Sequence, residues 1–110
     1  MAGVIRKSFE DPDQRIKYEH GAAQGVQAGD SVVWRSQLNP DWTWDTDVKP
    51  LTEGLTSCPL NHREYVVSGR IRYLMEDGSE TIGQTGEHLR IYPGHRAFVE
   101  GGEPCELIDW

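Results

Sequence analysis

The chain has 110 residues, and its 18 acidic and 11 basic residues give a net charge of −7. This charge argues against nucleic acids and anionic membrane surfaces as partners. Two cysteines are too few for a disulfide scaffold, and no apolar run has the length of a signal peptide or a membrane span. The composition therefore predicts one small domain that is soluble in the cytoplasm and keeps its thiols reduced.

The first 28 residues have the least regular pattern of the chain. One short edge strand is expected over residues 15–18, and glycines interrupt the sequence that follows. Because no periodicity continues through them, this arm is expected to lie along the domain or against a second subunit rather than to fold alone. His20 lies in this arm and is expected to be exposed.

The next segment predicts a strand that is followed by aromatic residues and a loop. Residues 31–38 alternate between two faces, as a half-buried strand does. Asn39-Pro40 ends this strand, because proline fixes its own φ and keeps the preceding residue out of the helical region. Trp42 and Trp44 then alternate, so they either fill the core or form the aromatic wall of a ligand pocket. Residues 45–54 are polar and predict a loop.

The rest of the chain reads as short strands between turns. Asp77-Gly78 is a strong signal for a hairpin turn, because glycine accepts the positive φ that such a turn needs. His88 is expected to face outward and Cys105 to lie in the core. The expected strands cover residues 56–58, 65–68, 70–76, 80–82, 89–92, 97–99 and 105–110. Turns spaced by about 8–12 residues, without helical periodicity, predict an all-β antiparallel sandwich or barrel.

An ordered set of short motifs then points to a family. The motifs are Pro40-Asp-Trp-Thr-Trp44, Lys49-Pro50, Ser57-Cys58, His62, Tyr65-Val-Val-Ser-Gly-Arg70, Asp77-Gly78, Gly86-Glu87, Pro93-Gly94-His95 and Glu103-Pro104-Cys105. In this order they resemble the small single-domain bacterial cupins of unassigned function. The resemblance implies a double-stranded β-helix, or jelly-roll barrel, with a central pocket. It also implies one cupin domain over residues 1–110, with an arm (1–28), a barrel (29–110) and homodimerisation through the arm.

The general cupin metal site, however, is not reproduced. It consists of a His-x-His pair, a glutamate seven residues before a glycine, and a later histidine. When the chain is aligned on Gly69, His62 falls at the glutamate position and Cys58 near the second histidine. The last histidine position falls on Ala97, while His95 lies two residues earlier on the same face of an expected strand. The candidate metal ligands are therefore Cys58, His62 and His95.

The chemistry of this set favours some metals over others. A thiolate and two imidazoles suit zinc, and three protein ligands leave one position for water. Iron(II) is the other candidate, although the carboxylate expected for iron oxygenases is missing at the aligned position. Glu64 has the same strand parity as His62 and would face inward if the strand begins at His62. The alternative is a metal-free pocket, in which Cys58 is a small buried apolar residue and His62 forms hydrogen bonds.

Two functions of different classes follow. The first is a small-molecule-binding module whose barrel is lined by Trp42, Trp44, Tyr73 and Phe98. The second is a metal-dependent enzyme of the isomerase, lyase or dioxygenase type, in which Cys58, His62 and His95 hold zinc or iron. A structural dimer with a vestigial pocket is a third reading. An arginine on the inner face of a strand would favour an anionic ligand, whereas strand arginines more often lie on the solvated face.

Overall fold

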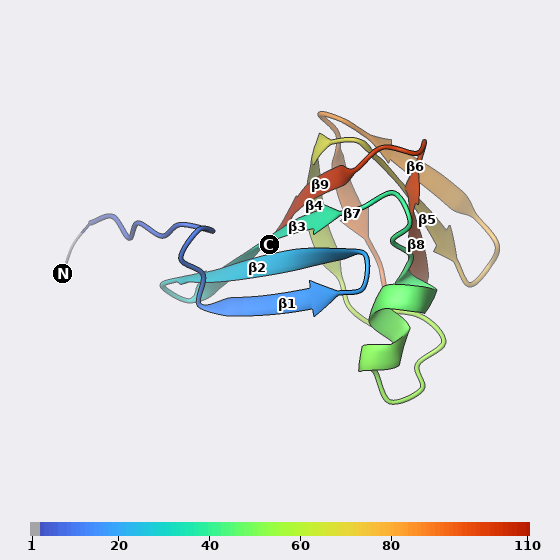
Figure 1. Ribbon diagram of the computed structural model, residues 1–110, viewed down its shortest axis with the longest axis horizontal. Coiled ribbons are helices and arrows are strands. Elements are labelled where there is room, and N and C mark those ends of the chain that lie inside the picture. Colours follow the sequence, from blue (N-terminus) through green and yellow to red (C-terminus); the bar gives the residue numbers. More distant parts are fainter. Residues whose placement is uncertain (1–2) are drawn as a thin grey trace.

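The computed structural model describes residues 3–110, which fold almost entirely into β-strands (Figure 1). Two short helical turns, η1 (Trp44–Val48) and η2 (Lys49–Leu51), lie between the third and fourth strands. The strands are β1 (Gln14–Tyr18), β2 (Gly21–Ala28), β3 (Ser31–Leu38), β4 (His62–Ser68), β5 (Arg70–Met75), β6 (Glu80–Gln84), β7 (His88–Ile91), β8 (His95–Glu100) and β9 (Cys105–Asp109). The all-β class expected from the sequence is thus confirmed.

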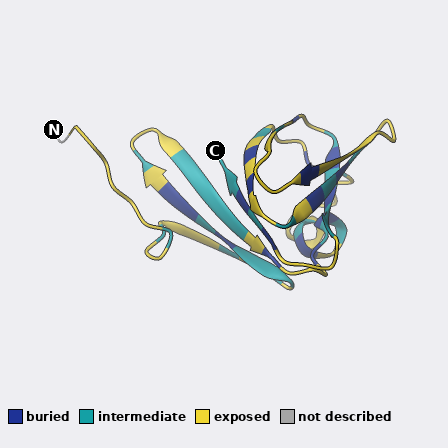
Figure 2. Ribbon diagram, turned by 90° about the horizontal axis from the view of Figure 1, so that it is seen from above, coloured by how far each residue is buried: buried dark blue, intermediate teal, exposed yellow. Residues whose placement is uncertain are grey.

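The strands form two antiparallel sheets. One has the order β1-β2-β3-β9-β4-β7, and the other has the order β6-β5-β8. Val66 of β4 and Leu107 of β9 belong to the same apolar core as Ile71 of β5 and Ala97 of β8, so this core joins the two sheets. Figure 2 shows buried residues in the barrel and also on β2, whereas the segment before β1 is mostly exposed. No helix among residues 3–110 has the length and apolarity needed to cross a membrane.

The turn between β4 and β5 joins the two sheets and requires a glycine. Gly69 has a φ of +75°, and a Cβ atom at this position would collide with the backbone carbonyl oxygen of Pro104. The predicted turn at Asp77-Gly78 is present between β5 and β6, where Gly78 has a φ of +88°. Both glycines therefore supply a backbone conformation that other residues rarely adopt.

The N-terminal arm is more ordered than the sequence predicts. Where one short strand is expected, the structure has β1 and β2, which extend the larger sheet beyond β3 (Figure 1). One of the glycines that look like breaks, Gly25, has a packing role instead. Gly25 lies opposite Trp34, and a Cβ atom on Gly25 would lie 3.0 Å from the indole ring. The missing side chain therefore makes room for the Trp34 ring on the sheet.

The segment predicted as a loop contains η1 and η2, and it anchors the β1–β2 turn. The buried carboxylate of Asp47 accepts hydrogen bonds from the backbone N–H of His20 (2.7 Å) and of Thr43 (3.2 Å). The imidazole Nδ1 of His20 lies 3.0 Å from the same carboxylate. His20 is therefore half-buried and paired rather than exposed, because a buried carboxylate requires partners.

Candidate metal centre

A cavity of about 350 Å³ lies inside the barrel. Its lining comes from both sheets, and it includes Ile16 and Tyr18 of β1, so the N-terminal arm contributes a wall. Most of the lining side chains are aliphatic or aromatic. A concave, largely apolar site with a few polar groups is the usual form of a small-molecule pocket in proteins.

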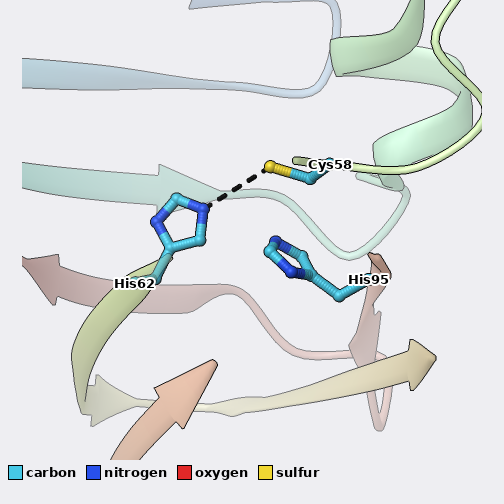
Figure 3. Close-up of side chains that lie close together, drawn as sticks. All are labelled: Cys58, His62 and His95. Atoms are coloured by element: carbon cyan, nitrogen blue, oxygen red, sulfur yellow. Dashed lines mark hydrogen bonds between the residues drawn. The ribbon is translucent and has the colours of Figure 1, made fainter. Parts of the chain in front are cut away.

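The three predicted ligands converge in this cavity from separate segments (Figure 3). His62 is the first residue of β4, and His95 is the first residue of β8. Cys58 precedes β4 and is held to β8 by two backbone hydrogen bonds of 2.8 Å, from its N–H to the His95 carbonyl and from the Gly94 N–H to its own carbonyl. One donor atom from each of the three side chains lies within 4.8 Å of the other two.

Hydrogen bonds fix the orientation of both imidazole rings. The Nδ1 atom of His95 lies 2.7 Å from the backbone carbonyl oxygen of Tyr92. A carbonyl oxygen only accepts, so this Nδ1 carries the proton and Nε2 keeps its lone pair. The Nδ1 atom of His62 lies 2.7 Å from Oδ2 of Asp109, which leaves its Nε2 facing Cys58. A carboxylate or carbonyl behind each imidazole is the usual arrangement around metal-binding histidines.

The donor types suit a tetrahedral metal ion, and the distance between Cys58 and His62 matches one. Typical zinc bonds of about 2.3 Å to sulfur and about 2.0–2.1 Å to nitrogen, at a tetrahedral angle, require a sulfur–nitrogen separation of about 3.6 Å. The Sγ atom of Cys58 lies 3.6 Å from Nε2 of His62. With His95 as the third donor, one coordination position stays open for water or a ligand.

Without a metal, the cluster pairs a thiolate with a protonated imidazole. Burial alone would raise the pKa of the Cys58 thiol, but hydrogen bonds with His62 and His95 outweigh this effect and lower the pKa to about 6. Burial disfavours the charged form of His62, yet its hydrogen bonds with Asp109 and Cys58 prevail and raise its pKa to about 10. At neutral pH Cys58 is therefore a thiolate, which is the form of cysteine that binds metals, whereas a metal would have to displace the proton that His62 holds on Nε2.

Two carboxylates of the site were not among the predicted site residues. Glu64 follows His62 on the same face of β4, and it accepts a hydrogen bond of 2.5 Å from the Tyr73 hydroxyl in the cavity. Burial raises the pKa of Glu64 to about 7, against the lowering effect of that hydrogen bond. Strand parity could identify Glu64 from the sequence. Asp109 has no such local signal, because it reaches His62 only through the pairing of β4 with β9.

The predicted aromatic lining is found in part. Trp42, Trp44 and Tyr73 line the cavity. Phe98 does not, because His95 and Ala97 occupy the inner face of β8 and the alternation of the strand turns Phe98 outward. Its ring lies 6.0 Å from the guanidinium carbon of Arg96.

His88 and Cys105 lie apart from the cluster. His88 is exposed, as expected from the sequence. Cys105 is buried in the core, also as expected, and burial raises the pKa of its thiol to about 12. Neither residue lines the cavity. A reactive or metal-binding thiol at neutral pH is therefore found at Cys58 and not at Cys105.

Comparison with known proteins identifies the fold. No protein-family model and no curated protein matches the sequence. Among solved structures, one similar chain is the oxalate decarboxylase of Lactobacillus farciminis in a formate complex. Its TM-score is 0.68 at 17% identity, and the match covers 99% of this chain and 32% of the decarboxylase chain. The iron(II) form of HppE has a TM-score of 0.66 at 15% identity, and the match covers 97% of this chain and 59% of HppE.

A third neighbour has nearly the same length as this chain. It is a protein of unknown function (DUF1255) from Acidithiobacillus ferrooxidans, with a TM-score of 0.64 at 18% identity, and the match covers 100% of this chain and 98% of the neighbour. The first two neighbours are longer, and this chain spans about a third of one and about three fifths of the other. The fold is therefore that of the cupins, a jelly-roll barrel, as the sequence motifs predict.

Proposed function

We propose that this protein is a small cupin that holds a divalent metal through Cys58, His62 and His95 and binds a small molecule in the adjoining cavity. The observation that carries the proposal is the convergence of three donor atoms within 4.8 Å. Hydrogen bonds behind the two histidines turn both Nε2 atoms away from their partners, toward the centre of the cluster. When bound, the metal supplies a Lewis acid with an open position beside the apolar wall.

Zinc is the favoured metal. One thiolate and two imidazoles are borderline-soft donors that match zinc, whereas iron(II) oxygenase sites use two histidines and a carboxylate. Glu64 is the carboxylate nearest along β4, but it is not part of the three-donor cluster. Iron(II) is the second choice, since a structural neighbour is known in an iron(II) form.

Elemental analysis tests the proposal directly. The protein is purified without a His tag or chelator, and the wild type is compared with Cys58→Ser, His62→Ala and the exposed-histidine control His88→Ala. We expect about one zinc per chain in the wild type and in His88→Ala, and little in the other two variants. Absence of metal after reconstitution with zinc and iron, or equal metal in all four proteins, contradicts the proposal.

A second candidate function is a metal-dependent enzyme of the isomerase, lyase or dioxygenase type. The observation that favours it is the Glu64–Tyr73 pair, a buried carboxyl group that faces the cavity beside the metal ligands. In this reading Glu64 exchanges a proton with the bound substrate. Any turnover of the zinc-loaded protein is then lost in Glu64→Gln while the zinc content stays unchanged. Turnover that survives in Glu64→Gln rejects this role.

We also propose a cytoplasmic homodimer. Cys58 and Cys105 are both free thiols, as a reducing compartment favours. β1 lies at the edge of the six-stranded sheet, and edge strands readily pair with a second chain. Light scattering coupled to size exclusion is expected to give twice the mass of the chain. A proline substitution at Lys17 in β1 is expected to shift that mass to the monomer, and a monomeric wild type rejects the dimer.

A further inference from the structure

Part of the cavity lining comes from three segments that contain none of the metal ligands. Ile16 and Tyr18 belong to β1, Trp42 and Trp44 follow β3, and Val48 ends η1. All five side chains are aromatic or aliphatic, and together they are called the arm-side wall below. The rings of Tyr18 and Trp42 meet edge to face, with their centroids 6.0 Å apart and their planes at 72°. This contact joins the wall of β1 to the wall that follows β3.

One buried carboxylate, that of Asp47, ties these three segments together. Its side chain has no exposure to solvent. It accepts hydrogen bonds from the backbone N–H of His20, which follows β1 (2.7 Å), and from the backbone N–H of Thr43, which separates the two tryptophans (3.2 Å). The Thr46 hydroxyl in η1 donates a third at 2.7 Å. Because a buried carboxylate is stable only with such partners, these bonds favour one arrangement of the three segments.

The position of β1 depends on this tie, because β1 is an edge strand. It pairs with β2 on one edge, and no other strand among residues 3–110 pairs with it. At the end of β1, His20 bonds to Asp47, and its carbonyl accepts a hydrogen bond of 2.9 Å from the N–H of Asn39. The placement of Ile16 and Tyr18 opposite the tryptophans therefore relies on a residue that does not itself line the cavity.

The metal ligands are held by different contacts. The backbone of Cys58 is bonded to that of His95 in β8, and the imidazole of His62 is bonded to Asp109 in β9. The hydrogen-bond partners of Asp47 are His20, Thr43 and Thr46, and none of them is a metal ligand. Loss of the Asp47 carboxylate is therefore expected to disturb the arm-side wall and to leave the metal ligands in place.

We propose that the arm-side wall is a subsite for an aromatic ring of the ligand and that Asp47 is the positioning residue that shapes this subsite. The inference rests on the proposed function, because it concerns the ligand of the same cavity. An aromatic ring fits this wall because contacts with tryptophan and tyrosine rings add to the gain from burial alone. A wall that is fixed before the ligand arrives strengthens binding, since less has to be ordered on association.

Fluorescence titration with N-phenyl-1-naphthylamine, an uncharged aromatic probe, tests the role of Asp47. The zinc content of each protein as purified is measured beside it. Asp47→Ala is expected to weaken probe binding about tenfold and to keep the zinc content of the wild type. Asp47→Asn keeps one acceptor oxygen, so its affinity is expected to lie between the two. Asp13→Ala is the matched control, because Asp13 also accepts a backbone N–H, from Gln27 at 2.7 Å, but does not line the cavity or touch its wall.

A second pair of variants tests the subsite without removing Asp47. Ile16 lines the cavity, so Ile16→Trp is expected to fill part of the subsite and to weaken probe binding about tenfold. The neighbouring Arg15 is exposed and does not line the cavity, so Arg15→Trp places the same side chain on the other face of β1. Arg15→Trp is expected to bind the probe like the wild type. This pair decides the subsite if Asp47→Ala does not fold, and Asp47→Asn then decides the positioning role.

The subsite is rejected if the wild type does not bind the probe or if Ile16→Trp binds it as well as Arg15→Trp does. The positioning role is rejected if Asp47→Ala and Asp47→Asn bind the probe like the wild type, or if Asp13→Ala weakens binding as much as Asp47→Ala does. A wild type that carries no metal but binds the probe in an Asp47-dependent way contradicts only the metal proposal. A wild type that holds zinc through Cys58 but does not bind the probe contradicts only this inference.

Discussion

At the scale of single residues, the groups behind the two histidines determine what the cluster can bind. The Tyr92 carbonyl and the Asp109 carboxylate each occupy Nδ1 of one ring, so Nε2 is the nitrogen left for the cluster, where that of His62 contacts Sγ of Cys58. The two partners differ in kind. The carbonyl belongs to the backbone and cannot be removed by substitution, whereas Asp109 is a side chain. A substitution at Asp109 can therefore test whether the orientation of the His62 imidazole matters for metal binding.

Asp109→Asn is expected to weaken zinc binding by about 10- to 100-fold without abolishing it, because an amide can still contact Nδ1 but carries no charge. Competition with a chromophoric chelator measures the affinity. Asp30→Asn, at an exposed position, is the control and is expected to bind zinc like the wild type. If the affinity of Asp109→Asn equals that of the wild type, Asp109 does not orient His62 for metal binding.

At the scale of secondary-structure elements, the connections between strands decide where the site residues meet. The β4–β5 turn at Gly69 carries the chain from one sheet to the other. The β1–β2 turn is joined to η1 through His20 and Asp47. Each connection depends on one local interaction that can be removed singly.

Gly69→Ala is expected to destabilise the protein by about 1 to 3 kcal/mol more than Gly78→Ala, because the added Cβ overpacks the site. Both glycines have a positive φ, so the backbone cost is similar at the two positions. Only at Gly69 does the added Cβ meet the Pro104 carbonyl, whereas nothing lies within 4 Å at Gly78. Urea unfolding monitored by tryptophan fluorescence gives the two free energies. Equal destabilisation in both variants would show that the close contact with Pro104 is relieved without cost.

The His20–Asp47 pair predicts a pH dependence of stability. The hydrogen bond with Asp47 raises the pKa of His20 above its ordinary value. A raised pKa in the folded state stabilises the protein below the unfolded pKa of about 6.5, and this contribution disappears as the pH rises through the folded pKa. The difference in unfolding free energy between the wild type and His20→Ala is therefore expected to be larger at pH 5.5 than at pH 9. A difference that stays constant or grows with pH would contradict this pairing.

At the scale of the whole molecule, local patterns predicted the architecture better than the site. Alternation identified the strand over residues 31–38, which is β3, and the turn at Asp77-Gly78. Cys58, His62 and His95 were recognised as candidates, and the structure brings them together. These features depend on residue type and short-range spacing, which a single sequence contains.

The features that the sequence did not reveal depend on long-range pairing. Gly25 reads as a break until Trp34 is placed opposite it in the neighbouring strand. Asp109 joins the site through the β4–β9 register, 47 residues from His62. Phe98 was predicted among the lining residues, but the inner face of β8 is occupied by His95 and Ala97. For Gly25 and Asp109 the deciding contact comes from tertiary structure, whereas for Phe98 the local alternation of β8 decides the outcome.

Zinc K-edge X-ray absorption of the zinc-loaded protein tests the central claim most directly, because it measures the ligands and not only the metal content. We expect one sulfur at about 2.3 Å and three nitrogen or oxygen ligands at about 2.0–2.1 Å, two of which show the outer-shell scattering of imidazole. The sulfur contribution is expected to disappear in Cys58→Ser. A first shell that contains only oxygen and nitrogen in the wild type would contradict a metal centre built on Cys58, His62 and His95.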